Sequence, residues 1–224
     1  MTSAALRKIE RKPVEVQAIE ALREAIVDGT IPAGERITEI NLSSAMNLSR
    51  ATLRSALHQL AQEGLVTLVP YTGWRVLKLG PQDVRELYTL RAALERLAAQ
   101  LSAGRLDDAM RASLEAAMDA LSEACAAGSA DEIAEADFAL HKAIVEAAGH
   151  GRLRSQYRLI EQQIRMYIRS SDALLAGGAE IRAQHVPIVE AILSGDPELA
   201  GRLSEEHNLS EGRKLSDHVA AAAG

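Results

Sequence analysis

The sequence predicts a mostly α-helical protein in which an N-terminal winged helix-turn-helix precedes a C-terminal antiparallel bundle of six or seven helices. Three observations indicate this fold class. Hydrophobic residues are 47% of the 224 residues but aromatic residues only 3%, which favours packed aliphatic helices over a sheet sandwich. Apolar residues recur with a helical period along most of the chain. Two short β-rich runs after Gly64 interrupt that period and are typical of a wing.

The expected domain boundaries follow from changes in these patterns. Residues 1–12 are expected to form a flexible, basic arm, and 13–77 the winged helix-turn-helix. A linker over 78–81 leads to the helical domain at 82–217, and a flexible tail is expected over 218–224. The sequence therefore predicts two domains joined by a short linker.

A short helix is expected just before the recognition helix. Thr38 is placed to cap its N-terminus, and Asn47 suits the turn that ends it because asparagine tolerates a positive φ. Ile40, Leu42 and Ala45 are expected to anchor this helix in the core. The segment has the features of the first helix of a helix-turn-helix.

The recognition helix is expected to begin after Ser49, a good N-cap residue. Arg50 and Arg54 are four residues apart and therefore share one face. The opposite, buried face carries Leu53, Leu57 and Leu60. Two guanidiniums on an exposed face can bind guanine N7 and O6 in the major groove. A merely solvated face is the alternative, but the cap, the spacing and the hairpin that follows all favour DNA binding.

The wing is expected to be a hairpin with strands at 65–69 and 74–77, joined by a turn at 70–73. Arg75 lies on the second strand and is available for a phosphate. The predicted DNA-contacting residues are Ser49, Arg50, Thr52, Arg54, Gly73 and Arg75.

Glycines and N-caps divide the second half of the chain into helices. The predicted helices span 82–103, 106–127, 130–148, 151–175, 179–194 and 197–217. Ser129 begins a capping box, and Asp196 is an N-cap followed by Pro197 at the first helical position. Pro187 predicts either a kink in the fifth helix or a later start for it.

Composition and charge restrict the location and the partners. A single cysteine, Cys125, rules out an internal disulfide, and no apolar run has the length of a membrane span or a signal segment, so a cytoplasmic protein is expected. The net charge is −6, but residues 1–80 hold ten basic against eight acidic residues, which leaves −8 for the remainder. The N-terminal domain can therefore bind DNA although the whole chain is acidic.

One group of residues in the bundle has the spacing of a metal site. Asp137 and His141 are four residues apart on one predicted helix face, and His185 and His207 lie on two later helices. A carboxylate and three imidazoles suit a divalent transition metal, and facing helices of a bundle can assemble such a site. From spacing alone, an exposed Asp–His pair with unrelated histidines remains an open alternative.

The N-terminal half resembles the winged helix of the GntR family. The resemblance spans about residues 14–77 and is carried by 31–37, 48–50, 53–54, 56–57, 60 and 63–66. Two positions depart from the family pattern. Ser55 stands where a glutamate is common, and Ile40 stands where some members carry an arginine. One base or phosphate contact of those relatives is therefore not carried over to this chain, whereas Arg50 and Arg54 match the family pattern.

The C-terminal half resembles the FCD effector domain of the FadR branch of that family, through residues 137–144, 185–196 and 206–209. This resemblance implies that Asp137, His141, His185 and His207 bind zinc, with nickel or manganese as alternatives. It also implies a small carboxylate effector near Arg91, whose alternative role is a surface pair with Glu95. Arg165 and Arg169, on the fourth predicted helix, are weaker effector-binding candidates.

Together these features predict a ligand-responsive transcription regulator. A homodimer is expected, because one small module reads too few base pairs of a palindromic operator for genomic specificity. An enzyme that carries a DNA-binding domain is one alternative, although no general base or nucleophile accompanies the predicted ligands. A regulator whose metal is purely structural is another. The residues do not decide whether the effector releases or strengthens DNA binding.

Overall fold

The computed structural model describes residues 12–78, 80–174 and 177–223. The chain forms two compact units, of which the first ends at Leu77 and the second begins at Lys78. Residues 1–11 of the predicted arm lie outside the described residues. In the described parts of the chain, no helix combines the length and the apolar character needed to cross a membrane.

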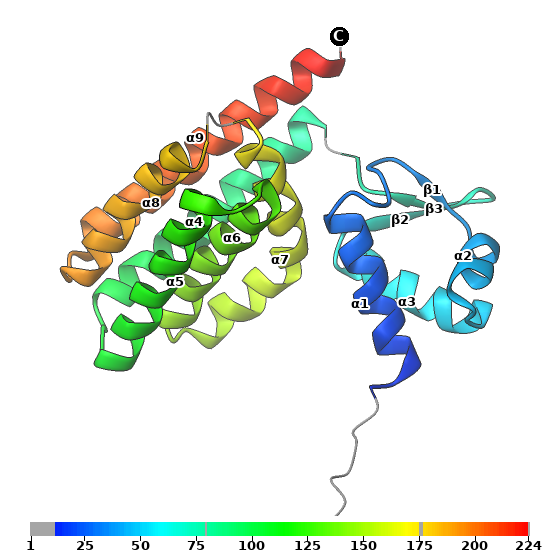
Figure 1. Ribbon diagram of the computed structural model, residues 1–224, viewed down its shortest axis with the longest axis horizontal. Coiled ribbons are helices and arrows are strands. Elements are labelled where there is room, and N and C mark those ends of the chain that lie inside the picture. The colour runs from blue at the N-terminus through cyan, green and yellow to red at the C-terminus, as the bar shows by residue number, and fades with distance from the viewer. Residues whose placement is uncertain (1–11, 79, 175–176, 224) are drawn as a thin grey trace, which may run out of the picture. The chain divides into compact units, whose positions relative to one another are not determined.

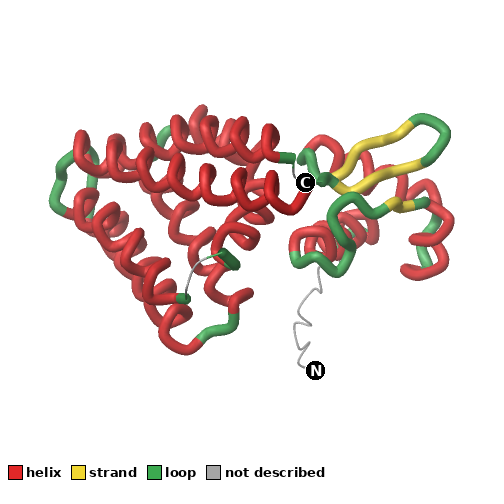
Figure 2. The backbone as a smooth tube through the Cα atoms, turned by 90° about the horizontal axis from the view of Figure 1, so that it is seen from above, coloured by secondary structure: helices red, strands yellow, loops and turns green. Residues whose placement is uncertain are grey.

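The N-terminal unit is a winged helix-turn-helix (Figure 1). Its elements are α1 (Val14–Val27), β1 (Arg36–Ile37), α2 (Glu39–Met46), α3 (Arg50–Gln62), β2 (Val66–Val69) and β3 (Gly73–Val76). The strands pair antiparallel in the order β1-β3-β2, and Figure 2 shows the β2–β3 hairpin as the wing. The short strand β1 was not predicted. It is two residues long, and two residues cannot show a strand period.

Local capping shapes the helix-turn-helix as the sequence predicted. The side chains of Thr38 and Ser49 accept hydrogen bonds from the first turns of α2 and α3, and Asn47 has a φ of 53°. The predicted anchors of α2 were partly wrong, because Ile40 is 59% exposed and Ala45 is also exposed. Leu42 packs on the core together with Met46, one turn later on the same face.

The C-terminal unit is a helical bundle in which the described residues form six helices (Figures 1 and 2). These are α4 (Pro81–Ala103), α5 (Asp108–Ala127), α6 (Ala130–Ala147), α7 (Gly151–Asp172), α8 (Gly178–Leu193) and α9 (Pro197–Ala223). The capping box at Ser129 and the cap at Asp196 are both present. The ends of α4 to α8 lie within three residues of the predicted ones.

One predicted helix end was wrong, and one alternative start is excluded. Helix α9 continues to Ala223, so residues 218–223 are helical and not the flexible tail expected from the sequence. The run of alanines there is the best helix-forming composition available. Helix α8 begins at Gly178 and passes through Pro187, so the later start is excluded. A proline removes only one helical hydrogen bond, and the buried apolar residues of α8 stabilise the turns on both sides.

Helix α4 is central, because it contacts α6, α7, α8 and α9. Two glycines of α9 permit an especially close approach. A Cβ atom at Gly201 would lie 2.5 Å from the Gln100 side chain, and one at Gly212 would lie 2.5 Å from the Cβ of Tyr88. Since Tyr88 is buried and cannot move aside, a side chain at position 212 would force α4 and α9 apart.

We therefore expect Gly212→Ala to destabilise the protein by about 1–3 kcal/mol, the usual cost of overpacking a buried contact. Equilibrium denaturation in guanidinium chloride measures the change. Gly151→Ala in α7 is the matched control, because a Cβ there meets no atom within 4 Å. Equal midpoints for the two variants would show that the α4–α9 contact does not need glycine.

Candidate metal centre and nucleic-acid interface

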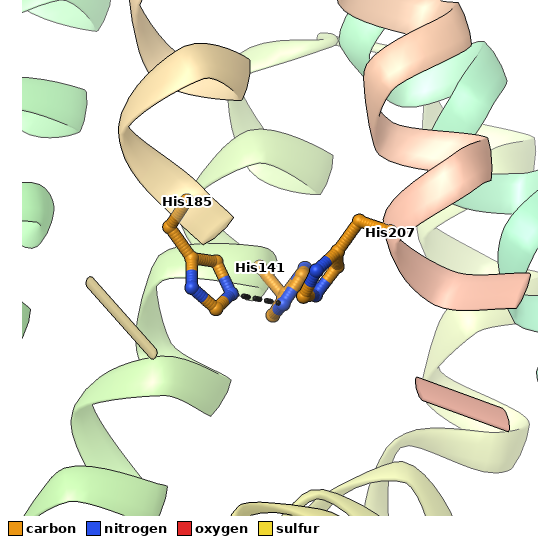
Figure 3. A group of neighbouring side chains, drawn as sticks. All are labelled: His141, His185 and His207. Atoms are coloured by element: carbon orange, nitrogen blue, oxygen red, sulfur yellow. Dashed lines mark hydrogen bonds between the residues drawn. The ribbon is translucent and has the colours of Figure 1, made fainter. Parts of the chain in front are cut away.

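Three histidines from three helices meet inside the C-terminal unit. His141 lies on α6, His185 on α8 and His207 on α9, and one ligating nitrogen from each lies within 4.8 Å of the others. Figure 3 shows the three rings turned toward one another. The Nε2 atoms of His141 and His185 are 3.0 Å apart. The arrangement brings together residues that are up to 66 positions apart in the sequence.

Asp137 joins this group from one turn before His141. Its Oδ1 atom lies 3.0 Å from Nε2 of His141 and 3.4 Å from Nε2 of His185. The side chain is buried, yet Oδ1 accepts no hydrogen bond of acceptable geometry from any described residue. A buried carboxylate oxygen without a hydrogen bond is costly unless a cation completes its surroundings. Asp137 therefore fits a metal ligand better than a structural acid.

Neighbouring acceptors fix how two of the histidine rings are oriented. Nδ1 of His141 lies 2.8 Å from a carboxylate oxygen of Glu95, and Nδ1 of His185 lies 2.8 Å from the carbonyl oxygen of Ile181. Because both partners can only accept, each Nδ1 donates, and each Nε2 keeps its lone pair when the ring is neutral. Two such lone pairs 3.0 Å apart require a proton or a metal cation between them.

The electrostatics of the group match this requirement. Burial opposes ionisation of Asp137, but His185 and His141 lower the pKa of its carboxyl well below the usual value. Burial lowers the pKa of His185, but the charge and hydrogen bond of Asp137, the Ile181 carbonyl and the charge of Asp172 together raise it above its ordinary value. Burial and then the other two histidines lower the pKa of His207 well below its ordinary value. A divalent cation would displace the proton, so its affinity should fall in acid.

Glu95 holds the surrounding layer together. Its Oε1 accepts from Nε of Arg91 at 2.8 Å and from the Tyr157 hydroxyl at 3.0 Å. Its Oε2 accepts from Nδ2 of Asn208 at 2.9 Å and lies 2.8 Å from Nδ1 of His141. Burial opposes ionisation, but Arg91 and then His141 hold the pKa of the Glu95 carboxyl well below its usual range. A buried carboxylate with four donors fixes the orientation of His141.

Arg91 forms the predicted pair with Glu95, but the pair is in the core and not on the surface. Only 2% of Arg91 is exposed, and its guanidinium carbon lies 5.5 Å from the centre of the Tyr88 ring. Its Nη2 atom is buried and has no hydrogen-bond partner among the described residues. The surface-pair alternative is therefore wrong, and the Nη2 donor of this guanidinium is left without a partner in the described part of the chain.

The other candidate arginines engage acidic residues of α6. Nε of Arg165 lies 2.7 and 2.9 Å from the two carboxylate oxygens of Glu135, and Arg169 pairs with Asp131. Effector binding by Arg165 stays a prediction.

Sequence reasoning missed several polar residues around the histidines. They are Glu95 as the acceptor for His141, with Tyr157, Asn208, Asp172 and Glu211. Helical spacing could have indicated two of them, because Glu95 is one turn after Arg91 and Glu211 is one turn after His207. Asp172 and Tyr157 lie on α7, which carries no predicted metal ligand, so only the fold places them near the histidines.

On the N-terminal unit, Arg50 and Arg54 share an exposed face of α3. Their side chains are 60% and 56% exposed, and both approach the carboxylate of Glu39 on α2. Arg54 donates two hydrogen bonds to it, at 2.9 and 2.8 Å, and Nη2 of Arg50 lies 3.9 Å from it. The hydrogen bond from Arg54 is the main reason that the pKa of Glu39 is lowered. The two guanidiniums thus project from one side of the helix.

The remaining predicted DNA contacts lie at the start of α3 and on the wing. Ser49 caps α3, and its hydroxyl is 2.8 Å from that of Thr52. Gly73 has a φ of 100°, and Nη1 of Arg75 donates to the carbonyl oxygen of Gly34 at 2.8 Å. Arg75 is exposed on β3 and therefore remains accessible to a phosphate.

Comparison with known families matches both units. Residues 15–76 match the model of bacterial regulatory proteins of the gntR family, and residues 86–210 match the FCD domain. The chain belongs to the GntR family. It is accordingly a DNA-binding transcriptional regulator with an FCD effector domain.

Relatives are similar over most of the chain. The "Probable D-xylose utilization operon transcriptional repressor" of Paenarthrobacter nicotinovorans is 30% identical, over 97% of this chain and 91% of its own length. The "HTH-type transcriptional repressor GlaR" of Escherichia coli strain K12 is 30% identical over 84% of this chain and 90% of its own length. The solved structure of Escherichia coli McbR/YncC shares the fold, with a TM-score of 0.76 at 18% identity, covering 93% of this chain and 99% of that one.

We expect Glu95→Gln to destabilise the protein by about 3–5 kcal/mol at neutral pH, because Arg91 would keep a buried charge without its counter-ion. Denaturant titration measures the loss. Since the pKa of Glu95 is lowered on folding, its contribution is fully present above the pKa of the unfolded carboxyl, about 4.3, and disappears as the pH falls through the folded value.

The exposed Glu86 on the same helix provides the control, because Glu86→Gln should leave stability unchanged. A gap between Glu95→Gln and the wild type that persists at the lowest pH would contradict this account.

Proposed function

We propose that this protein is a metal-dependent regulator that senses a small carboxylate and acts as a homodimer on a palindromic operator. The observation that carries the proposal is the buried, unpartnered Nη2 of Arg91, which belongs to the same hydrogen-bonded network as His141. A free guanidinium donor beside a carboxylate-imidazole group is suited to an anion that also reaches a metal.

The metal would be held by Asp137, His141, His185 and His207. Their donor atoms are one carboxylate oxygen and three imidazole nitrogens, which suit zinc, with nickel or manganese as alternatives. When bound, the metal supplies a positive charge that attracts an anionic ligand. Glu95 and the Ile181 carbonyl hold the rings of His141 and His185 in the ligating orientation whether or not an effector is present.

The response would pass through α4. This helix carries Arg91 and begins at Pro81, four residues after the N-terminal unit ends at Leu77. An acid bound to Arg91 would interact directly with the element that leads to the DNA-binding unit. A ligand that prefers one position of α4 then shifts the population of DNA-binding dimers, with a coupling free energy of about 1–3 kcal/mol.

On the DNA side, we expect Arg54→Ala to remove sequence discrimination, because a bidentate contact to a base contributes about 1–3 kcal/mol. Competition gel shifts with operator and scrambled DNA measure the loss. Arg54→Lys keeps the positive charge but not the two parallel donors of the guanidinium, so this variant should retain only non-specific DNA binding. Arg202→Ala, an exposed arginine of α9, is the control. Unchanged discrimination by Arg54→Ala would exclude α3 as the reading helix.

At the metal centre, we expect His185→Ala to lose bound zinc while the exposed His218→Ala retains it, as measured by elemental analysis after gel filtration. Full occupancy in His185→Ala would mean that the ligand set is different.

Calorimetric titration of the zinc-loaded protein with lactate and succinate, repeated after chelation, tests the sensing role. Binding without turnover that disappears on chelation supports the proposal. Consumption of the acid would indicate an enzyme, and failure of every small acid tested to bind, hydroxylated acids included, while zinc stays bound would indicate a structural metal.

A further inference from the structure

Three buried acceptor atoms around Arg91 and His207 have no hydrogen-bond partner among the described residues. They are Oδ2 of Asp172 on α7, and Oδ1 of Asn208 and Oε2 of Glu211 on α9. Buried acceptors without a donor are uncommon in folded proteins. Three of them beside a candidate binding site call for a common explanation.

The orientation of Asn208 is determined by its surroundings. Its Nδ2 donates to Oε2 of Glu95 and to the carbonyl oxygen of Ser204, both at 2.9 Å. Because both partners are acceptors, the amide cannot be reversed without losing two hydrogen bonds. Oδ1 of Asn208 is therefore an acceptor that finds no donor among the described residues.

Glu211 lies on the same side of α9, one turn after His207 and three residues after Asn208. Its Oε1 accepts from Lys214 at 3.0 Å, while Oε2 is buried and unpartnered. Glu211 and His207 also line a cavity of about 270 Å³ between α8 and α9. One unpartnered acceptor is thus adjacent both to a candidate metal ligand and to open space.

Asp172 approaches the same interior from the end of α7. Burial, followed by the charge of Asp137, raises the pKa of Asp172 to about 8, and His185, Arg91 and Glu211 act on the same carboxyl. Its Oδ2 atom is buried and has no hydrogen-bond partner among the described residues. Asp172 lines a second cavity, of about 370 Å³, together with Ile181, whose carbonyl oxygen accepts from His185.

We propose that the effector is a polyhydroxylated carboxylate, an acid whose carbon chain carries several hydroxyl groups. This proposal rests on the proposed function. The carboxylate would bind Nη2 of Arg91, and the hydroxyls along the chain would donate to Asn208, Glu211 and Asp172. An aliphatic acid would leave all three acceptors buried without donors, and a site of that kind discriminates strongly against an analogue that lacks the matching group.

Hydroxyl groups fit better than an ammonium group. The interior offers acceptors on two helices together with the buried Nη2 donor of Arg91. A hydroxyl can satisfy both kinds of partner, whereas an ammonium can only donate.

Calorimetry on the zinc-loaded full-length protein tests the proposal. Threonate, xylonate and gluconate are each compared with the alkanoate of equal carbon number, and 6-aminohexanoate is the ammonium-bearing probe. We expect at least one hydroxylated acid to bind about 100-fold more tightly than its alkanoate. Alkanoates that bind as tightly as every hydroxylated acid, or a preference for 6-aminohexanoate, would overturn this inference and leave the proposed function standing. Binding of none of these acids, and of neither lactate nor succinate, would overturn both.

Two nearly isosteric variants locate the effect. Glu211→Gln and Asp172→Asn should each weaken binding of the preferred hydroxylated acid about 10-fold and leave binding of the alkanoate unchanged. The zinc content of each variant shows whether the metal centre is intact. Glu198→Gln, on an exposed position of α9, is the matched control. Equal weakening of both acids would overturn the assignment of these side chains to the hydroxyl groups. If a variant fails to fold, the wild-type series still decides.

Discussion

The carboxylate of Glu95 is the constraint on which the C-terminal unit depends. It is buried on α4 and accepts from side chains on α4, α6, α7 and α9, so one charged group connects four helices. Buried charges are tolerated only when they are paired and fully hydrogen-bonded, which Glu95 achieves. The same contacts orient His141 toward the centre and hold Arg91 with one donor free. Stability and ligand chemistry thus share a single network.

Close packing makes that network possible. The side chains of Glu95 and Asn208 can meet only because α4 and α9 approach closely at Gly201 and Gly212. Larger residues at those positions would separate the helices and leave both polar groups without partners. The two glycines therefore affect the polar network, although the atoms nearest to a Cβ at either position belong to the side chain of Gln100 or Tyr88 on α4.

Much of the architecture could be predicted because it is encoded locally. Caps such as Ser129 and Asp196, and the helical spacing of Asp137 and His141, are short-range signals that survive in a single sequence. The predictions failed where contacts between residues far apart in the sequence determine the structure. Ile40 is a residue type that is usually buried, but it lies on the exposed side of α2. Helix α8 continues through Pro187 because its apolar face is buried.

The candidate site shows the same division. Residue types and their resemblance to the FCD domain indicated the four candidate ligands and Arg91, while the burial of Arg91 and the roles of Glu95 and Asn208 depend on how α4 meets α9. Asp172 is the extreme case. Nothing near it in the sequence suggests a raised pKa, which arises from burial and from the charge of Asp137 on another helix.

The Glu39 carboxylate on α2 bears on how the regulator would select DNA. It engages the fork of Arg54 and lies near Arg50, so both guanidiniums already have an anionic neighbour in the free protein. If Arg54 contacts a base, DNA binding exchanges one partner for another and does not simply add a new one. Isolated phosphates would compete poorly with the bidentate Glu39 carboxylate for Arg54, so complexes with random duplexes should dissociate quickly. Selectivity for the operator over other DNA would then depend on competition from Glu39 as much as on the contacts to the operator bases.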